Sequence, residues 1–157
     1  MQVSVIIPVL NEEVSITTCL DQFQGVDDVE LIVVDGGSTD GTQKAVEAQC
    51  MARWVCAREP GRAQQMNVGA AVASGEILLF LHADTFLPSN GIALIRDSLG
   101  LSDVVGGRFE LGLSENTFGF RLVAMFSTLR SRYLGVTYGD QGIYVRRDVF
   151  EKVDGFP

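Results

Sequence analysis

The 157-residue sequence has little of several features, and each shortage excludes a class of protein. No apolar run approaches the roughly 20 residues that a helix needs to span a bilayer, which argues against a membrane-spanning chain. The three cysteines are odd in number and scattered, so we expect free thiols at core positions rather than a disulfide framework or a zinc site. A net charge of −8, with only 12 basic side chains, argues against nucleic acid as a partner.

The amino terminus also lacks the basic and apolar segments of a secretion signal, because Met1-Gln-Val-Ser leads directly into an apolar run. We therefore expect a cytoplasmic protein. With 46% hydrophobic residues and no repeat, linker or low-complexity segment, the length fits one well-packed domain. Six of the 12 basic side chains, but only four of the 20 acidic ones, lie after Glu115. A basic end on an acidic body suggests two different partners.

Apolar periodicity predicts that strands and helices alternate over the first hundred residues. Asn11 is expected to cap the first helix, with Glu12 and Glu13 in its first turn. The third helix consists mostly of small residues, which predicts unusually close packing against its neighbours. This alternation predicts four parallel strands joined by right-handed crossovers. The expected strands are 3–8, 29–34, 53–57 and 76–81, and the helices that follow them are 11–23, 40–52, 67–74 and 88–99.

From Val104 the pattern changes. Alternating residues 105–113 predict a strand with one wetted face, and residues 117–134 carry apolar side chains at helical spacing. Residues 139–146 read as a loop entering a strand, followed by a short helical turn over 147–153. The apolar stripe around Met125 indicates core or subunit interface, as in a homodimer. A membrane-facing or lipid-acceptor surface is the alternative.

Acidic residues follow two of the predicted strands at the point where each strand ends. Asp35 comes after a buried run and precedes two glycines, and Asp84 follows the fourth strand. Ligands of open α/β sheets bind beyond the carboxyl ends of the strands, so we expect both carboxylates at one edge. The alternatives are structural: Asp35 only caps its turn, Asp40 only caps the next helix, and Asp84 only caps the turn before Pro88.

The polar residues near Asp84 point to a metal and a phosphate. A carboxylate beside His82 can hold Mg²⁺ or Mn²⁺ while a substrate diphosphate supplies further ligands. His82 is a second candidate ligand, although a single histidine at a strand end is more often a hydrogen-bonded wall residue. Arg62 lies on a glycine loop, where a guanidinium can fork onto phosphate oxygens, and Asn67 can orient the same ligand. A solvated arginine and a helix-surface amide are the alternatives.

Four motifs, in order, resemble the inverting family 2 glycosyltransferases with the GT-A fold. They are residues 5–12 (VIIPVLNE), 34–42 (VDGGSTDGT), 61–69 (GRAQQMNVG) and 75–85 (GEILLFLHADT). Residues 139–142 (GDQG) and 155–157 (GFP) look like the acceptor side of that family, and the FLHADT wording resembles a small bacterial subgroup. The resemblance implies a three-layer α/β/α domain with a mostly parallel, Rossmann-like sheet, incomplete at its carboxyl end. Residues 1–100 would be the nucleotide-sugar-binding half, and residues 101–157 a truncated acceptor-side half.

The resemblance also implies roles for individual residues. Asp35 would accept a hydrogen bond from the nucleotide base, usually uracil. Asp84 matches the last acid of the family's Asp-x-Asp metal motif, in which His82 replaces the first acid. The family's catalytic base usually follows the Gly-Phe-Pro turn and is expected beyond Pro157, which leaves Asp140 as a weak nearby candidate. The implied nucleotide-sugar-binding residues are Pro8, Glu12, Asp35, Arg62, Asn67 and Ala83.

The leading hypothesis is therefore a metal-dependent transferase that moves a sugar from a UDP-linked donor to an acceptor hydroxyl with inversion. The acceptor would be a lipid-linked or small molecule, with peripheral contact at the inner membrane face. The alternative is a nucleotide-sugar-binding module or assembly subunit that lacks the catalytic base. A nucleotidylyltransferase would need a glycine-rich basic loop after the first strand, and a dinucleotide-dependent oxidoreductase would need Gly-x-Gly-x-x-Gly there. The sequence has neither.

Overall fold

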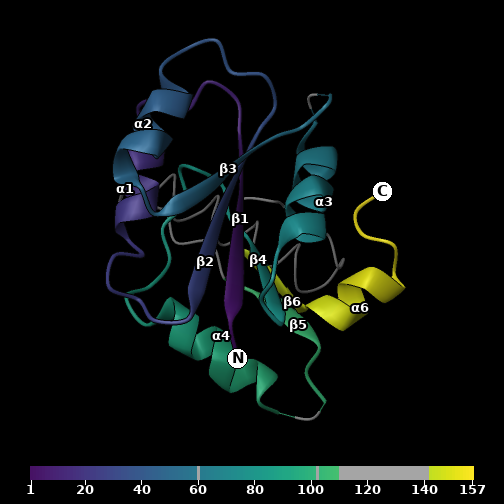
Figure 1. The fold of residues 1–157 in the computed structure, drawn as a ribbon. Helices are drawn as coiled ribbons and strands as arrows, with labels where there is room; N and C mark the ends of the chain where they lie inside the picture. The colour runs from purple at the N-terminus through teal and green to yellow at the C-terminus, as the bar shows by residue number, and fades with distance from the viewer. Residues whose placement is uncertain (60, 102, 110–141) are drawn as a thin grey trace, which may run out of the picture.

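The computed structural model describes residues 1–59, 61–101, 103–109 and 142–157, and its strands form one sheet (Figure 1). The strand order is β3-β2-β1-β4-β6-β5. The first four strands run parallel, whereas β6 pairs antiparallel with both β4 and β5. This arrangement confirms the mostly parallel sheet that the sequence predicted. The strands are β1 (Val3–Val9), β2 (Val29–Asp35), β3 (Ala52–Cys56), β4 (Ile77–Phe80), β5 (Gly106–Arg108) and β6 (Ile143–Arg146).

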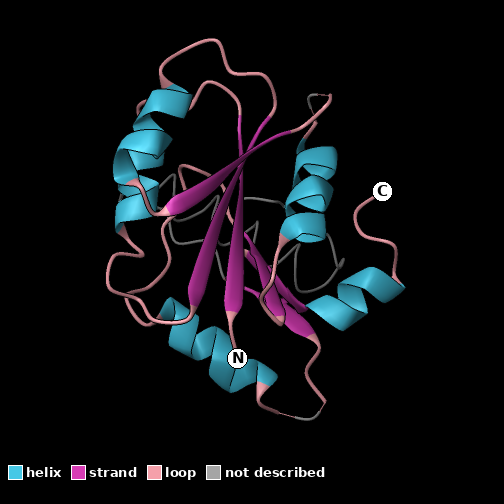
Figure 2. Cartoon of the chain, viewed as in Figure 1, coloured by secondary structure: helices cyan, strands magenta, loops and turns pink. Residues whose placement is uncertain are grey.

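Helices cover both faces of this sheet and make three layers (Figure 2). Successive residues of β1 alternate between the layers: Val5 and Ile7 pack with α1, α2 and α4, while Ile6 packs with α3 and α6. Because both faces are covered, the central strands read as continuous apolar runs, and all seven residues of β1 are buried. The helices are α1 (Ile16–Asp21), α2 (Thr42–Gln49), α3 (Arg62–Val72), α4 (Gly91–Leu99) and α6 (Arg147–Lys152). Within the described ranges, no helix is long and apolar enough to cross a membrane.

Helix α3 packs directly on the sheet, as its small residues predicted. A Cβ atom added to Gly69 would lie 2.4 Å from Ile6 Cγ2 and 3.0 Å from Val34 Cγ2. Real Cβ contacts are not that short, so the absence of a side chain at Gly69 sets the distance between α3 and strands β1 and β2.

The predicted start of the first helix is wrong. Helix α1 begins at Ile16 after Ser15, and no acidic residue lies in its first turn. Asn11 instead has a left-handed backbone (φ 58°), and its Oδ1 accepts the backbone N–H of Thr39 at 2.8 Å. Asparagine adopts this backbone conformation more readily than most residues, and here its amide joins two loops. Glu12 and Glu13 therefore belong to the β1–α1 loop.

Two other expectations need correction. Helix α2 ends at Gln49, because Cys50 adopts a left-handed backbone (φ 52°) at its end, and Ala52 already belongs to β3. The cysteines are free, as expected, but only Cys19 is buried, whereas Cys50 and Cys56 are exposed. The predicted short helical turn after Arg146 is confirmed by α6. The predicted helix over 117–134, its stripe around Met125, and Asp140 lie outside the described residues.

At the amino-terminal edge of the sheet, Glu30 connects three segments of the chain. Its Oε2 atom accepts hydrogen bonds from Ser4 Oγ at 2.6 Å, from the Ser74 N–H at 2.7 Å and from Ser74 Oγ at 2.9 Å. Partial burial acts to raise the pKa of Glu30, but these hydrogen bonds outweigh it and leave the pKa below its ordinary value of 4.5. The carboxylate thus ties β1 and β2 to the turn before β4.

We expect Glu30→Gln to lower the free energy of unfolding by about 1 kcal/mol at pH 7, because charge-assisted hydrogen bonds are lost at a partly exposed site. Since folding lowers the pKa of Glu30, its contribution is present above pH 4.5 and is lost as the pH falls through the folded-state pKa. Urea unfolding at pH 7 and at about pH 3 measures the difference between wild type and variant. A difference that stayed constant between these pH values would contradict the assignment. Glu47→Gln, on the exposed face of α2, is the matched control.

Candidate functional site

The loops that carry the two predicted acids open at the same edge of the sheet. Strand β1 lies between β2 and β4, with Val9 beside Asp35 on one side and Ile6 beside Phe80 on the other. The pairing continues past the strands, because Gly36 N–H donates to Val9 O at 2.9 Å and Leu81 N–H donates to Ile6 O at 3.0 Å. Asp35 ends β2, and Asp84 follows β4 by four residues. The carboxyl ends of β1, β2 and β4 therefore form one rim.

Asp35 is 7% exposed and its carboxylate is bonded to its own turn. Oδ1 accepts the Ser38 N–H at 2.9 Å and the Ser38 hydroxyl at 2.5 Å, and Oδ2 accepts the Gly37 N–H at 3.1 Å. The turn-capping role that the sequence left open is thus present. Each carboxylate oxygen can accept more than one hydrogen bond, so a role toward a ligand stays a prediction.

The β1–α1 and β2–α2 loops are locked together by hydrogen bonds that run in both directions. Glu12 N–H donates to Thr42 Oγ1 at 2.8 Å, and Glu13 N–H donates to Asp40 Oδ2 at 3.2 Å. In return, Gly41 N–H donates to Glu13 Oε2 at 3.1 Å. Hydrogen bonds, chiefly from the Thr42 hydroxyl, hold the pKa of Asp40 below its ordinary value. Asp40 also accepts the Thr42 N–H at the start of α2, so its predicted contact with that helix is present, although Gly41 is the capping residue.

Asp84 lies on the exposed part of the next loop. Its Oδ1 atom receives a long hydrogen bond of 3.4 Å from Thr85 Oγ1, while the preceding Ala83 is buried and His82 is half-buried. Beneath the loop, burial raises the pKa of the Cys19 thiol to about 12, a hydrogen bond from Gln22 opposes this, and the charges of Asp84 and Glu12 add to it. Both the Asp84 loop and the Glu12 loop therefore lie near Cys19.

The donor set at Asp84 fits a divalent cation that shares its ligands with a substrate. Over the described ranges, no three His, Cys, Asp or Glu side chains converge to hold a metal without help. Mg²⁺ and Mn²⁺ are commonly held by one or two carboxylates together with phosphate oxygens, and Asp84 offers an exposed carboxylate in such a position. His82 interacts with other groups of the protein, and its roles as a metal ligand or as a wall residue both stay predictions.

Sequence reasoning missed Gln65, which holds α3 against the rim. This side chain is 4% exposed, and its Nε2 donates to Val9 O at 2.9 Å and to Val34 O at 2.8 Å. The amide therefore joins the ends of β1 and β2 beneath the site. Gln65 and Gly69 are four residues apart and both are buried on the same face of α3, but the sequence alone does not say which face of the helix is buried.

Replacing Gln65 with leucine is expected to cost about 1–2 kcal/mol of folding free energy, because two buried carbonyls lose a donor. The neighbouring Gln64 is exposed, so Gln64→Leu changes the same chemistry without these bonds and should stay within about 0.5 kcal/mol of wild type. Urea denaturation of the three proteins gives both values. Equal stability of the two variants would rule out the structural role of Gln65.

Arg62 and Asn67 lie on α3 but face different surroundings. The prediction that Arg62 lies on a loop and that the helix begins at residue 67 is wrong, because α3 begins at Arg62 directly after Gly61, and the Arg62 side chain is exposed. A cavity of about 480 Å³ lies between the end of β3 and α3 and is lined by Cys56, Arg58 and Asn67 among others. Polar groups and an arginine at the carboxyl end of β3 thus extend the rim, and Arg62 stays a predicted phosphate contact.

The amide of Asn67 is bonded at both ends to the carboxyl-terminal turn. Its Nδ2 donates to Phe156 O at 2.9 Å, and its Oδ1 accepts the Phe156 N–H at 2.9 Å. Gly155 has a positive φ of 78°, and a Cβ there would lie 2.6 Å from Asn67 Oδ1. The Phe156 ring then packs edge-on against Phe80 at 4.8 Å. The structure therefore gives Asn67 a role in holding the carboxyl-terminal turn against α3. The contact with a nucleotide sugar that the resemblance implied stays a prediction.

Residues 4–153 match the protein-family model described as glycosyl transferase family 2. Among curated relatives, the glycosyltransferase AglE of Haloferax volcanii is 31% identical over 175 residues, covering 99% of this chain and 56% of the relative. Glucosyl-3-phosphoglycerate synthase of Mycobacterium tuberculosis is 31% identical over 135 residues, covering 67% of this chain and 41% of the relative. The chain spans about half the length of the curated relatives it matches.

Solved structures show the same fold. A mannosyltransferase from Pyrobaculum calidifontis, in complex with GDP-Man and Mn²⁺, aligns with a TM-score of 0.80 at 26% identity and covers 99% of this chain and 47% of its own. Glucosyl-3-phosphoglycerate synthase from Mycobacterium tuberculosis, in complex with Mn²⁺, UDP-Glc and glycerol 3-phosphate, aligns with a TM-score of 0.70 at 25% identity and covers 95% and 58%.

Proposed function

Because the chain belongs to glycosyl transferase family 2 and has the GT-A fold, we propose that it carries the donor site of a sugar transferase. The donor would be a nucleoside diphosphate sugar bound over the carboxyl ends of β1, β2 and β4. The observation that carries this proposal is the placement of Asp35 at the end of β2 and of Asp84 on the loop after β4, because these two strands flank β1 and end at one rim. One acid suits the nucleoside and the other suits the diphosphate with its cation.

The nucleoside end of the donor is assigned to the β1 and β2 side of the rim. Pro8 and Glu12 lie on that side, and the locked loops of residues 11–13 and 38–42 give a fixed wall beside Asp35. Uracil, with an N–H that can donate to Asp35, is the proposed base. The two structural relatives described above hold UDP-Glc and GDP-Man, so the shared diphosphate sugar is better supported than the base.

The diphosphate end is assigned to the β4 side, where Asp84 would hold Mg²⁺ or Mn²⁺, with Ala83 beside it and Arg62 across the rim. When bound, the cation would offset the charge that develops on the departing diphosphate. The acceptor hydroxyl would attack the anomeric carbon on the face opposite the leaving group. The bond from that carbon to the diphosphate oxygen breaks with its electron pair on the diphosphate, and the hydroxyl proton passes to a base. The acceptor would be a small or lipid-linked molecule.

Calorimetry with the 157-residue chain tests the donor site. We expect saturable binding of UDP in the presence of Mn²⁺, weaker binding after the metal is removed with EDTA, and weaker binding of GDP than of UDP. Absence of binding by either nucleotide with Mn²⁺ would overturn the proposal. Hydrolysis or transfer assays with UDP-sugars then measure turnover, and binding without turnover would favour the alternative of a nucleotide-sugar-binding module.

A further inference from the structure

The loop that carries Asp84 rests on the carboxyl-terminal end of α1. Cys19 Sγ donates a long hydrogen bond of 3.7 Å to His82 O at the start of this loop. The side chain of Gln22 meets the loop further along, where its Nε2 donates to Thr85 O at 3.3 Å and its Oε1 accepts the Leu87 N–H at 2.9 Å. The α1 end therefore supports the loop on both sides of Asp84.

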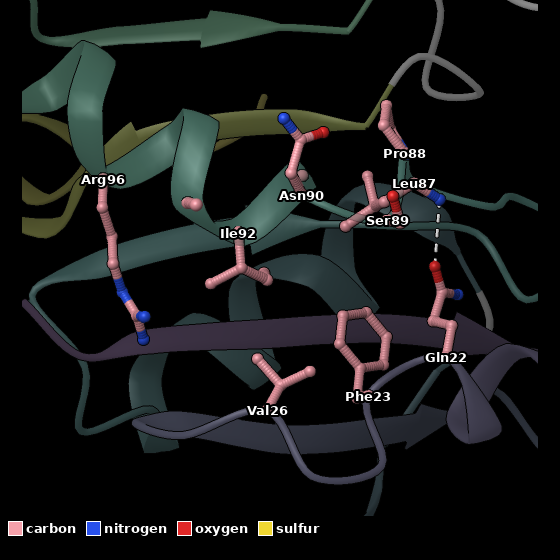
Figure 3. Close-up of a pocket in the computed structure, with 11 residues that line it drawn as sticks. Gln22, Phe23, Val26, Leu87, Pro88, Ser89, Asn90, Ile92 and Arg96 are labelled. Atoms are coloured by element: carbon pink, nitrogen blue, oxygen red, sulfur yellow. Dashed lines mark hydrogen bonds between the residues drawn. The ribbon is translucent and has the colours of Figure 1, made fainter.

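Gln22 is well placed for this role because its amide has both a donor and an acceptor. The donor end is also fixed to its own helix, since Nε2 donates to Cys19 O at 2.9 Å. Figure 3 shows the side chain reaching from the α1 end to the backbone at Leu87, with the hydrogen bond drawn between them. The Gln22 side chain thus ties the backbone of Thr85 and Leu87 to the end of α1.

On the side of α4 the loop is held by Leu87, which packs against the hydrophobic core and lies beside Gly91, the first residue of α4. A hollow of about 220 Å³ lies there, lined by Phe23, Leu87, Pro88 and Ile92 as well as Gln22 (Figure 3). Asp84 itself is exposed, and its carboxylate accepts a long hydrogen bond of 3.4 Å from Thr85 Oγ1. The backbone of the loop therefore decides where the carboxylate lies, and the Gln22 amide holds that backbone at Thr85 and at Leu87, on the carboxyl-terminal side of Asp84.

We propose that Gln22 is a positioning residue for Asp84, acting through the backbone of Thr85 and Leu87 to place the carboxylate for the cation. This inference rests on the proposed function, because it assumes that Asp84 contacts the metal bound with the donor. Groups that orient a metal ligand are typically worth about 10- to 100-fold in metal affinity when they are removed.

The test compares Gln22→Met, which keeps the length of the side chain and removes both hydrogen bonds, with Gln24→Met on the exposed surface two residues later. Titration of Mn²⁺ into protein and UDP, followed by the electron paramagnetic resonance signal of free Mn²⁺, gives the metal affinity. Calorimetry in EDTA gives the metal-free affinity for UDP. We expect Gln22→Met to weaken Mn²⁺ binding about tenfold or more. Metal-free UDP binding should stay within about twofold, and Gln24→Met should match wild type in both measurements.

A second variant, Gln22→Glu, guards against loss of folding because it keeps the acceptor for Leu87. Its added negative charge alone would strengthen Mn²⁺ binding, so weaker binding identifies a positional effect. Unchanged Mn²⁺ affinity in both variants, with wild type binding UDP and Mn²⁺ normally, would overturn the positioning role and leave the proposed function in place. Equal losses with and without metal would also overturn it. Failure of wild type to bind UDP with Mn²⁺ would overturn both.

Discussion

Asp84→Ala should weaken Mn²⁺-dependent binding of UDP by about 100-fold, equivalent to about 2.7 kcal/mol. The exposed carboxylate of Asp84 is the proposed protein ligand on the loop after β4, and removing it would leave the cation dependent on the diphosphate and water. Binding in EDTA should hardly change, because Asp84 is assigned to the cation and not to the nucleoside. Calorimetry with and without Mn²⁺ separates these two quantities.

The control for this prediction is Asp97→Ala, which removes an exposed carboxylate from α4 and should bind as wild type does. Asp84→Asn is informative as well, since it keeps the shape of the side chain and one oxygen but loses the charge. If Asp84→Ala bound UDP and Mn²⁺ as tightly as wild type, the metal would have to be held elsewhere and the diphosphate end of the proposed site would be wrong.

Gly69→Ala should destabilise the fold by about 2–3 kcal/mol, although alanine is the better helix former by about 1 kcal/mol. The added Cβ would lie 2.4 Å from Ile6 Cγ2, and neither β1 nor α3 can move without disturbing other contacts. Helix α3 is held to the same two strands by Gln65, four residues earlier. The clash should therefore outweigh the gain in helix propensity, and urea denaturation measures the net change.

Ile6→Ala provides the matched test, because it removes both atoms of Ile6 that crowd the new Cβ. The single variant should itself be destabilised by about 2–5 kcal/mol through loss of buried volume. The loss of folding free energy in the double variant should be smaller than the sum of the two single-variant losses by about 1 kcal/mol or more. Strict additivity, or a Gly69→Ala protein as stable as wild type, would mean that α3 can shift and that its close approach is not fixed by Gly69.

Much of the fold followed from local patterns in the sequence. Buried strands such as β1 and β2 are largely apolar runs, so their parallel direction and shared rim could be predicted. The same local signal failed at Asn11, because an asparagine before two acids is typical of a helix cap. Here it bonds Thr39 on a different loop instead. A pattern in one segment does not say which second segment will compete for the same side chain.

The supporting amides of the site escaped prediction for a similar reason. Gln22, Gln65 and Asn67 are ordinary helix residues by sequence, and their roles depend on backbone groups that are far away along the chain. The partner of Asn67 is Phe156, 89 residues later, and Gln22 bonds Leu87, 65 residues later. The position of an acid at a strand end can be predicted because the fold class dictates it. The supporting role of an amide cannot be predicted until its hydrogen-bond partners are known.

The locking of residues 11–13 to residues 38–42 has a practical consequence for engineering. Asn11, Glu12 and Glu13 each form a hydrogen bond with the second loop. In addition, Gly41 N–H in the second loop donates to the Glu13 side chain. Libraries that randomise one loop alone would mostly contain variants that have lost these hydrogen bonds between the loops. Each loop would then appear intolerant of mutation. Combinatorial libraries that vary both loops together should recover many more folded members, and statistical coupling between the two segments among the survivors would be the sign to look for.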